Sequence, residues 1–310
     1  MSLAFVFPGQ GSQSIGMLAD LAATYPQVEQ TFAEASAVLG YDLWKIVQNG
    51  PESELNNTAV TQPAMLCAGV AAWRIWQAQG GAMPKMMAGH SLGEYTALVC
   101  AGAISFTDAV ALVAERGRLM QEAVPAGEGA MAAILGLEDA QVLAVCNEAA
   151  QGEVVSAVNF NSPGQVVVAG KSGAVNRAVE LAKAAGAKRA LLLPVSVPSH
   201  CALMKPAADK LAERLKSITV KSPAIPVVNN VDVTMASEPD AIRDALVRQL
   251  YSPVRWVETI EKMAASGVTQ LVECGPGKVL VGLNKRIVKE MATWAVYDPA
   301  GLEQAKSELA

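Results

Sequence analysis

The stretch from Gly89 to Glu94, with the sequence Gly-His-Ser-Leu-Gly-Glu, constrains the fold of this chain more than any other. It follows the apolar residues 86–88 and precedes a helical pattern of apolar side chains, which predicts a strand, a tight turn and a helix. Glycines at 89 and 93 let two backbone segments approach closely, so Ser91 can occupy a strained turn with its hydroxyl exposed. A nucleophilic serine and a serine that only packs in a turn both fit this pattern.

Length and composition limit the class of protein. The chain has 310 residues, of which 52% are hydrophobic and 17% charged, enough for one large domain that carries a smaller inserted one. The net charge of −5 argues against nucleic-acid binding, which needs a basic face. The five cysteines are scattered and lack Cys-x-x-Cys spacing, so we expect reduced thiols in the cytoplasm and no metal site.

The N-terminal residues favour neither a targeting segment nor a nucleotide site. Residues 1–19 lack the basic start of a signal peptide, residues 8–11 interrupt the apolar run, and no later segment is apolar enough to span a membrane. A dinucleotide fingerprint is incomplete here, because Ser14 stands where its third glycine belongs. The loop after this first strand can still place the Gln10 backbone N–H in an oxyanion hole, or it is a plain turn.

The order of apolar runs predicts an α/β fold in two parts. The first part has a strand at 3–7, helices at 26–39 and 63–79, and a helix from Thr107, with Trp73 and Trp76 in the core. A strand–helix–strand–strand–helix–strand order, typical of a ferredoxin-like unit, then occupies 130–135, 138–150, 154–160, 165–169, 174–185 and 189–195. We expect this small domain at 128–196, inserted into a catalytic domain formed by 1–127 and 197–310. The second part continues with helices at 202–216, 239–250, 254–265 and 277–290, and strands at 225–229, 268–273 and 293–297.

A serine nucleophile needs a base, and the chain has only two histidines. His90 is adjacent to Ser91, and neighbouring side chains at a sharp turn point apart. His200 lies where the inserted domain returns to the main one and is therefore the candidate base. A residue to orient His200 is not evident, because Asp209, Asp232, Asp240 and Asp244 resemble helix caps or surface acids. A backbone carbonyl can hold the imidazole as well.

Two arginines are candidates for gripping a substrate carboxylate. Arg116 and Arg118 are two residues apart on one predicted helix, so they lie on different faces. The residue that points inward can form two parallel hydrogen bonds with a carboxylate, and position alone does not choose between them.

Along nearly its whole length the chain resembles the malonyl-CoA:acyl carrier protein transacylases of bacterial dissociated fatty acid synthesis. The matching stretches are residues 7–13, 89–94, 159–165, 197–200 and 275–278. This resemblance implies an α/β-hydrolase-like large domain with a parallel sheet, a ferredoxin-like insert, and an active site between them. It also implies a ping-pong acyl transfer with no cofactor, in which malonyl-CoA and acyl carrier protein are the partners.

The resemblance further implies a role for each site residue. Ser91 would be the nucleophile, His200 its base, and the main-chain carbonyl of Gln249 the group that orients His200. The backbone N–H groups of Gln10 and Leu92 would form the oxyanion hole. The residues that would bind substrate are Arg116, which holds the malonyl carboxylate, and Asn161.

The same resemblance implies that the carrier protein is acidic. Because this chain is itself net negative, docking of the carrier requires a local basic surface on this chain. The candidates are Lys183, Lys188, Arg189, Lys285 and Arg286, although scattered solvated charges explain them equally well. We expect a monomer. The alternatives to malonyl transfer are a serine esterase or thioesterase, and a non-catalytic scaffold that docks the carrier protein.

Overall fold

The computed structural model describes residues 2–195 and 197–309, which contain one parallel and one antiparallel sheet. The parallel sheet has the order β7-β2-β1-β8-β9. Its strands are β1 (Leu3–Phe7), β2 (Met86–Gly89), β7 (Val227–Val228), β8 (Gln270–Cys274) and β9 (Ala292–Val296). Because these strands are parallel, their carboxyl ends lie at one edge of the sheet, where ligands bind in open α/β folds.

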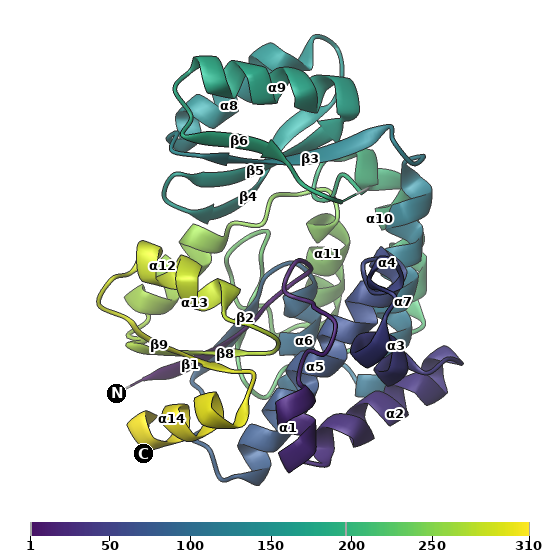
Figure 1. Cartoon of the computed structure of the whole chain (residues 1–310), viewed down its shortest axis with the longest axis vertical. Coiled ribbons are helices and arrows are strands. Elements are labelled where there is room, and N and C mark those ends of the chain that lie inside the picture. The colour runs from purple at the N-terminus through teal and green to yellow at the C-terminus, as the bar shows by residue number, and fades with distance from the viewer. Residues whose placement is uncertain (1, 196, 310) are drawn as a thin grey trace.

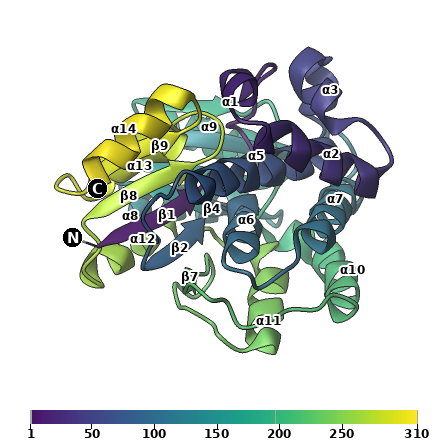
Figure 2. The same cartoon turned by 90° about the horizontal axis from the view of Figure 1, so that it is seen from below.

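Helices cover both faces of the parallel sheet (Figures 1 and 2). Those that precede the inserted unit are α1 (Ala19–Thr24), α2 (Gln27–Leu39), α3 (Leu43–Asn49), α4 (Glu52–Leu55), α5 (Thr58–Ala78), α6 (Leu92–Cys100) and α7 (Phe106–Ala123). Those that follow it are the short 3-10 helix Ala202–Met204, α10 (Lys205–Lys216), α11 (Pro239–Gln249), α12 (Trp256–Ala265), α13 (Val279–Ile287) and α14 (Pro299–Leu309).

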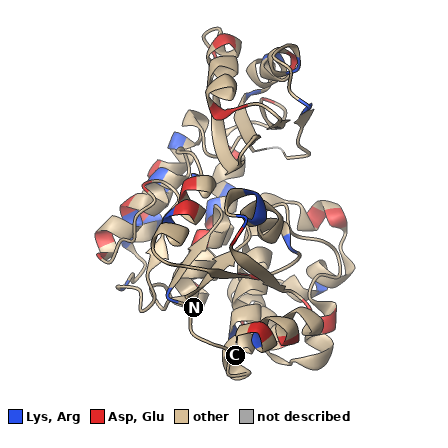
Figure 3. Cartoon of the chain, turned by 90° about the vertical axis from the view of Figure 1, so that its left-hand side faces the viewer, with Lys and Arg blue, Asp and Glu red and all other residues tan. Residues whose placement is uncertain are grey.

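Strand β1 shows why the sheet is buried on both sides. Its side chains alternate, so Phe5 packs toward α5 while Ala4 and Val6 join the cluster formed with α12 and α13. The Phe5 ring meets Trp73 and Trp76 edge-on, with 5.2 Å between ring centroids in both pairs. The two tryptophans therefore lie in the core, as predicted. In Figure 3 charged residues lie mainly on helices, and β1, β2, β7 and β9 carry none.

The antiparallel sheet has the order β4-β5-β3-β6. Its unit consists of β3 (Gly129–Leu135), α8 (Asp139–Ala150), β4 (Val155–Ser162), β5 (Gln165–Lys171), α9 (Ser172–Ala184) and β6 (Arg189–Leu192), which is the predicted element order. Helices α8 and α9 cover the outer face of this sheet, and its other face lies toward the parallel sheet (Figure 1). Backbone hydrogen bonds from Phe160 N–H to Val254 O and from Val254 N–H to Val158 O join the two parts.

The predicted fold class, an α/β protein with a parallel sheet and a separate smaller unit, is confirmed. The boundary proposed at 196 lies outside the described residues, and the division into two domains stays a prediction.

Several element boundaries differ from the predictions. Helix α5 begins at Thr58 rather than at Pro63, because the Asn57 side chain accepts the Ala59 N–H at 3.0 Å and starts the helix earlier. Strand β6 ends at Leu192 rather than at 195, since Pro194 has no N–H to donate to a ladder. The strand predicted at 225–229 has only two residues, and helices α1, α3, α4 and α14 were not predicted.

Candidate active site

Ser91 stands in a strained turn between β2 and α6. Its backbone has φ 52° and ψ −110°, a conformation that costs energy for a residue with a Cβ. The glycines on either side allow the turn to pack closely. A Cβ at 93 would lie 2.1 Å from the Phe7 carbonyl oxygen, and a Cβ at 89 would lie 1.8 Å from the Gly93 carbonyl carbon. Close packing on β1 therefore holds the serine at the carboxyl edge of the parallel sheet.

His200 meets Ser91 from a distant part of the chain. Ser91 Oγ lies 2.8 Å from His200 Nε2, a hydrogen bond of the length a nucleophile and its base require. On the other side of the ring, Nδ1 lies 2.7 Å from the backbone carbonyl oxygen of Gln249. The His200 N–H donates to the Leu250 carbonyl, which fixes the backbone of this residue as well. The end of α11 thus orients the imidazole with main-chain carbonyls.

His90, the other histidine, lines the same cavity as Ser91, but within the described residues no hydrogen bond joins its ring to the serine hydroxyl. Its Nε2 lies 2.8 Å from Asn161 Oδ1, and its ring packs against Trp256 at 5.5 Å between centroids. Asn161 is thereby placed beside His90, whereas the cavity at Ser91 is lined by its neighbour Asn159. The substrate-binding role of Asn161 stays a prediction.

Arg116 is the arginine that points inward. It is 1% exposed, and burial lowers the pKa of its guanidinium. Arg118 instead pairs with Glu115 and Glu122 on the exposed side of α7. The structure thus shows which of Arg116 and Arg118 points inward, which their positions in the sequence could not decide.

Three oxygens surround the Arg116 guanidinium. Nη1–H donates to Gln62 Oε1 at 2.9 Å, and Nη2–H donates to Gln249 Oε1 at 3.0 Å. Nη2 also lies 3.4 Å from Ser91 Oγ, Nε makes no hydrogen bond within the described residues, and the guanidinium carbon lies 5.3 Å from the centre of the Tyr95 ring. A guanidinium carries more N–H donors than these contacts use, so a substrate carboxylate can still be bound. Gln62 gave no sequence signal, because its role depends on the packing of α5 against α7.

A buried carboxylate lies behind the serine. Glu94 is 2% exposed, and its Oε2 accepts the Asn230 N–H at 2.9 Å and Gln249 Nε2–H at 2.8 Å. Burial raises the pKa of Glu94 to about 7. Gln249 therefore contacts the base through its carbonyl, and both Arg116 and Glu94 through its side chain. Neither Glu94 nor the Gln249 side chain was predicted to contribute to the site.

The site opens into a cavity of about 110 Å³ between the two sheets. Gln10 and Leu92 line it from the parallel-sheet side, and their backbone N–H groups donate to no carbonyl oxygen of the described chain. Met131, Asn159 and Leu193 line it from the smaller unit. Free N–H groups beside a serine and a histidine are the arrangement that stabilises a tetrahedral oxyanion.

The predicted docking residues lie at the surface. Lys188, Arg189, Lys285 and Arg286 are all exposed. Arg286 Nη1–H donates to Gln165 Oε1 at 2.9 Å, and Leu135 of β3 is in register with both Gln165 and Arg189. Arg189 and Arg286 therefore belong to the same end of the antiparallel sheet. Lys183 pairs with Glu180 instead.

Within residues 2–195 and 197–309, no helix is long and apolar enough to cross a bilayer, and no three His, Cys, Asp or Glu side chains gather as metal ligands. The five cysteine thiols are free.

The fold and the serine–histidine pair are those of an acyl-transfer enzyme, and comparison with known proteins identifies the class. Residues 4–307 match the family model of the acyl transferase domain, and the chain belongs to this family. More narrowly, it is similar to malonyl CoA-acyl carrier protein transacylases. The one from Escherichia coli strain K12 is 67% identical over 302 residues, which cover 97% of this chain and 98% of that protein. The resemblance drawn from the sequence motifs is thus confirmed.

Solved structures agree with this assignment. An acyl carrier protein S-malonyltransferase from Vibrio cholerae O1 biovar eltor is 64% identical, with a TM-score of 0.96, and the match covers 99% of this chain and 100% of that one. A malonyl-transacylase in complex with its type II PKS acyl-carrier protein is 63% identical, with a TM-score of 0.98 and the same coverage.

Proposed function

We propose that this protein transfers a malonyl group from malonyl-CoA to the pantetheine thiol of acyl carrier protein in fatty acid biosynthesis. One observation carries the proposal. Ser91 Oγ lies 2.8 Å from His200 Nε2 and 3.4 Å from Arg116 Nη2 in a single cavity, so a nucleophile, its base and a carboxylate receptor converge. The names of the relatives support the same reaction.

The reaction proceeds in two acyl transfers through one ester. Ser91 Oγ attacks the malonyl thioester carbonyl while His200 Nε2 accepts the hydroxyl proton. The N–H groups of Gln10 and Leu92 stabilise the oxyanion, and the tetrahedral intermediate collapses as the C–S bond breaks and the CoA sulfur takes the proton from His200. The pantetheine thiol of the carrier then gives its proton to His200, attacks the malonyl-Ser91 ester, and Ser91 Oγ leaves with that proton. Gln249 orients His200 throughout.

Arg116 selects the malonyl group. Its buried guanidinium presents N–H donors beside Ser91, so the free carboxylate of a malonyl ester forms charge-assisted hydrogen bonds there. An acetyl group has no such carboxylate and forms no charge-assisted hydrogen bond with these donors. Asn161 contributes indirectly, by holding the ring of His90 next to the nucleophile.

Acyl carrier protein docks on the basic surface formed by Lys188, Arg189, Lys285 and Arg286, which lies at the end of the antiparallel sheet marked by Leu135. An acidic partner is attracted to this surface although the chain as a whole is negative. The catalytic groups come from one chain and act by acid–base and nucleophilic chemistry. The enzyme therefore works as a monomer without a cofactor, and its free thiols suit the cytoplasm.

The test is an intact-mass measurement after incubation with malonyl-CoA, followed by addition of acyl carrier protein that carries its pantetheine arm. We expect a mass increase of one malonyl group, absent in Ser91→Ala, and its transfer to the carrier thiol. Release as free malonate at the same rate with and without carrier would identify an esterase or thioesterase. Neither an adduct nor release of CoA would leave only a carrier-docking scaffold.

A further inference from the structure

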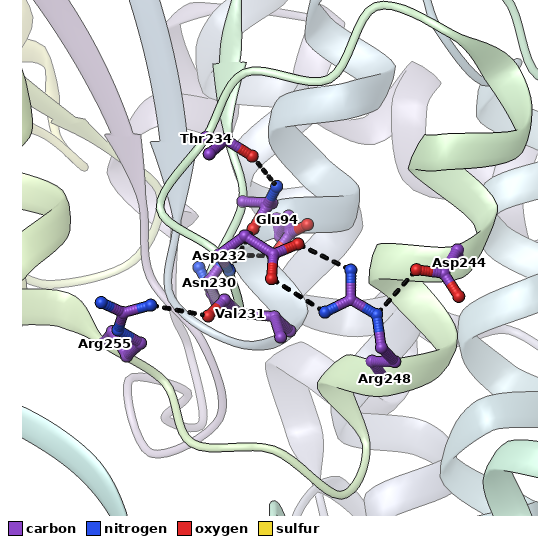
Figure 4. Close-up of polar contacts among 9 residues, drawn as sticks. Glu94, Asn230, Val231, Asp232, Thr234, Asp244, Arg248 and Arg255 are labelled. Carbon is purple, nitrogen blue, oxygen red and sulfur yellow. Dashed lines mark hydrogen bonds and ion pairs between the residues drawn. The ribbon is translucent and has the colours of Figure 1, made fainter.

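The loop 229–234 follows β7 and contacts the turn that carries Ser91 through hydrogen bonds of Asn230. Figure 4 shows the polar contacts that hold this loop. Two arginines from different elements hold this loop. Arg248 of α11 forms a bidentate pair with the Asp232 carboxylate at 2.9 and 2.6 Å, and Arg255 Nη1–H donates to the Val231 carbonyl at 3.1 Å. Arg248 precedes Gln249, the residue that orients His200. The same helix end therefore fixes both the base and the loop behind the nucleophile.

Asn230 occupies the centre of this loop and bridges the serine turn. Its Nδ2–H donates to the Gly89 carbonyl at 2.7 Å, and its Oδ1 accepts the Ser91 N–H at 2.7 Å. Its own backbone N–H donates to Glu94 Oε2 at 2.9 Å. Asn230 is 0% exposed, so water does not compete for these hydrogen bonds. One side chain thus ties the end of β2 to the strained residue two positions further on.

This bridge bears on catalysis because the turn is strained. At φ 52° and ψ −110° the Ser91 backbone needs its surroundings to hold it, and a relaxed turn would move Oγ away from His200 Nε2. The Ser91 N–H is also occupied by Asn230, so the adjacent Leu92 N–H is the donor that this turn offers to the cavity. Holding the strained turn and occupying the Ser91 N–H require one side chain with a hydrogen-bond donor and an acceptor at fixed positions. A primary amide provides both.

We propose that Asn230 is a positioning residue for the nucleophile: its side-chain amide holds the Ser91 turn so that the hydroxyl meets His200 and the Leu92 N–H faces the oxyanion. The proposal rests on the proposed acyl transfer through Ser91. Asn230 touches no substrate, so its loss lowers kcat and leaves KM for malonyl-CoA nearly unchanged.

The neighbouring Asn229 provides a matched control from the same loop. Its side chain accepts the Asp232 N–H at 2.7 Å and donates to Thr234 Oγ1 at 3.1 Å, so its described hydrogen bonds stabilise the loop and do not reach the serine turn. Asn229→Ala loosens the loop alone, whereas Asn230→Ala removes the bridge to Ser91. Comparing the two separates loop order from positioning of the nucleophile.

The experiment measures malonyl transfer and the rate of Ser91 modification by a fluorophosphonate, a serine-directed probe that needs neither malonyl-CoA nor carrier. For Asn230→Ala we expect kcat and the labelling rate to fall roughly 10²-fold, the loss typical of a misplaced catalytic group, with KM changed less than about twofold. If Asn230→Ala fails to fold, Asn230→Asp is the substitute, because it retains the shape of the side chain. It keeps the acceptor for the Ser91 N–H but loses the donor to the Gly89 carbonyl. We expect it to lose about tenfold in both rates.

Equal losses in Asn229→Ala and Asn230→Ala would overturn the proposal, as would a folded Asn230→Asp with wild-type rates. Losses in both Asn230 variants, with Asn229→Ala within about twofold of wild type, would support it. Failure of the acyl-transfer proposal is a different result: wild-type protein would then form no malonyl adduct, whatever the labelling rates of the variants.

Discussion

The Nδ1 atom of His200 lies 2.7 Å from the backbone carbonyl oxygen of Gln249. Donation to this carbonyl keeps the proton on Nδ1 and leaves Nε2 free to accept one from Ser91. A carbonyl carries no full charge, so it stabilises an imidazolium less than a carboxylate does. Burial first, and then the positive charge of Arg116, lowers the pKa of His200 to about 3. His200 is therefore a neutral base throughout the physiological pH range.

The pH dependence of acylation follows from this pKa. Because the base is lost only when pH falls through the lowered pKa, the rate of Ser91 acylation should stay constant from pH 8 to pH 5. A histidine with the ordinary value of 6.5 would lose roughly thirtyfold at pH 5. Stopped-flow measurement of CoA release across this range checks the prediction. Because the pKa of Glu94 is about 7, Glu94→Gln is the control, and an acid limb centred near pH 6.5 in both proteins would show that the environment of His200 is more solvated than described.

Removing the guanidinium should change selectivity for the acyl group. A charge-assisted pair contributes about 1.5–3 kcal/mol, so Arg116→Ala should lower malonyl transfer relative to acetyl transfer by roughly ten- to hundredfold. The measurement is kcat/KM for malonyl-CoA and acetyl-CoA. Arg118→Ala, which removes an exposed arginine of the same helix, is the control and should keep the wild-type ratio. Equal losses for both substrates in Arg116→Ala would mean that Arg116 does not bind the carboxylate.

Charge reversal on the basic surface should weaken carrier binding alone. In Arg189→Glu and Arg286→Glu we expect KM for acyl carrier protein to rise about three- to tenfold, more at low salt, while KM for malonyl-CoA stays constant. Lys306→Glu, on helix α14, which packs on the other face of the parallel sheet from α13, is the control for net charge. An unchanged KM for the carrier in both variants would mean that the carrier binds at another surface.

A second buried carboxylate predicts a pH effect on stability. Glu273 of β8 is 0% exposed, accepts the Val281 N–H at 2.8 Å, and burial raises its pKa to about 7. Between about pH 4.5 and 7 the folded protein holds a proton that the unfolded chain does not, so the free energy of unfolding falls as pH rises through this window.

Glu273→Gln removes this contribution, while Glu94 and His200 titrate in both proteins. The stability of the variant relative to wild type should therefore increase by roughly 1 to 3 kcal/mol from pH 4.5 to pH 7.5, measured by urea unfolding. A difference that is constant with pH would show that Glu273 titrates normally.

The sequence was sufficient to predict those catalytic side chains that a local motif or the residue composition marks. The glycines around Ser91 mark a tight strand–turn–helix, and the scarcity of histidines left His200 as the base. Arg116 could not be told from Arg118 by position, because the direction of each side chain depends on how α7 packs against its neighbours.

The remaining groups could not be predicted from local pattern. The Gln249 carbonyl and the Leu92 N–H belong to the main chain, so no residue type marks them, and only the family resemblance indicated them. Asn230 and Gln62 act through contacts between segments far apart in sequence. Amides of this kind are common, and nothing in their neighbouring residues distinguishes them from surface amides.

The most direct test of the account is to locate the malonyl group after rapid mixing with malonyl-CoA, by mass analysis of proteolytic peptides from wild type and His200→Ala. We predict that the wild type carries the malonyl ester on the peptide that contains Ser91. In His200→Ala the same ester should form about 10²- to 10⁴-fold more slowly, the usual contribution of a general base. A malonyl group on any other residue, or an unchanged rate without the imidazole, would contradict the account.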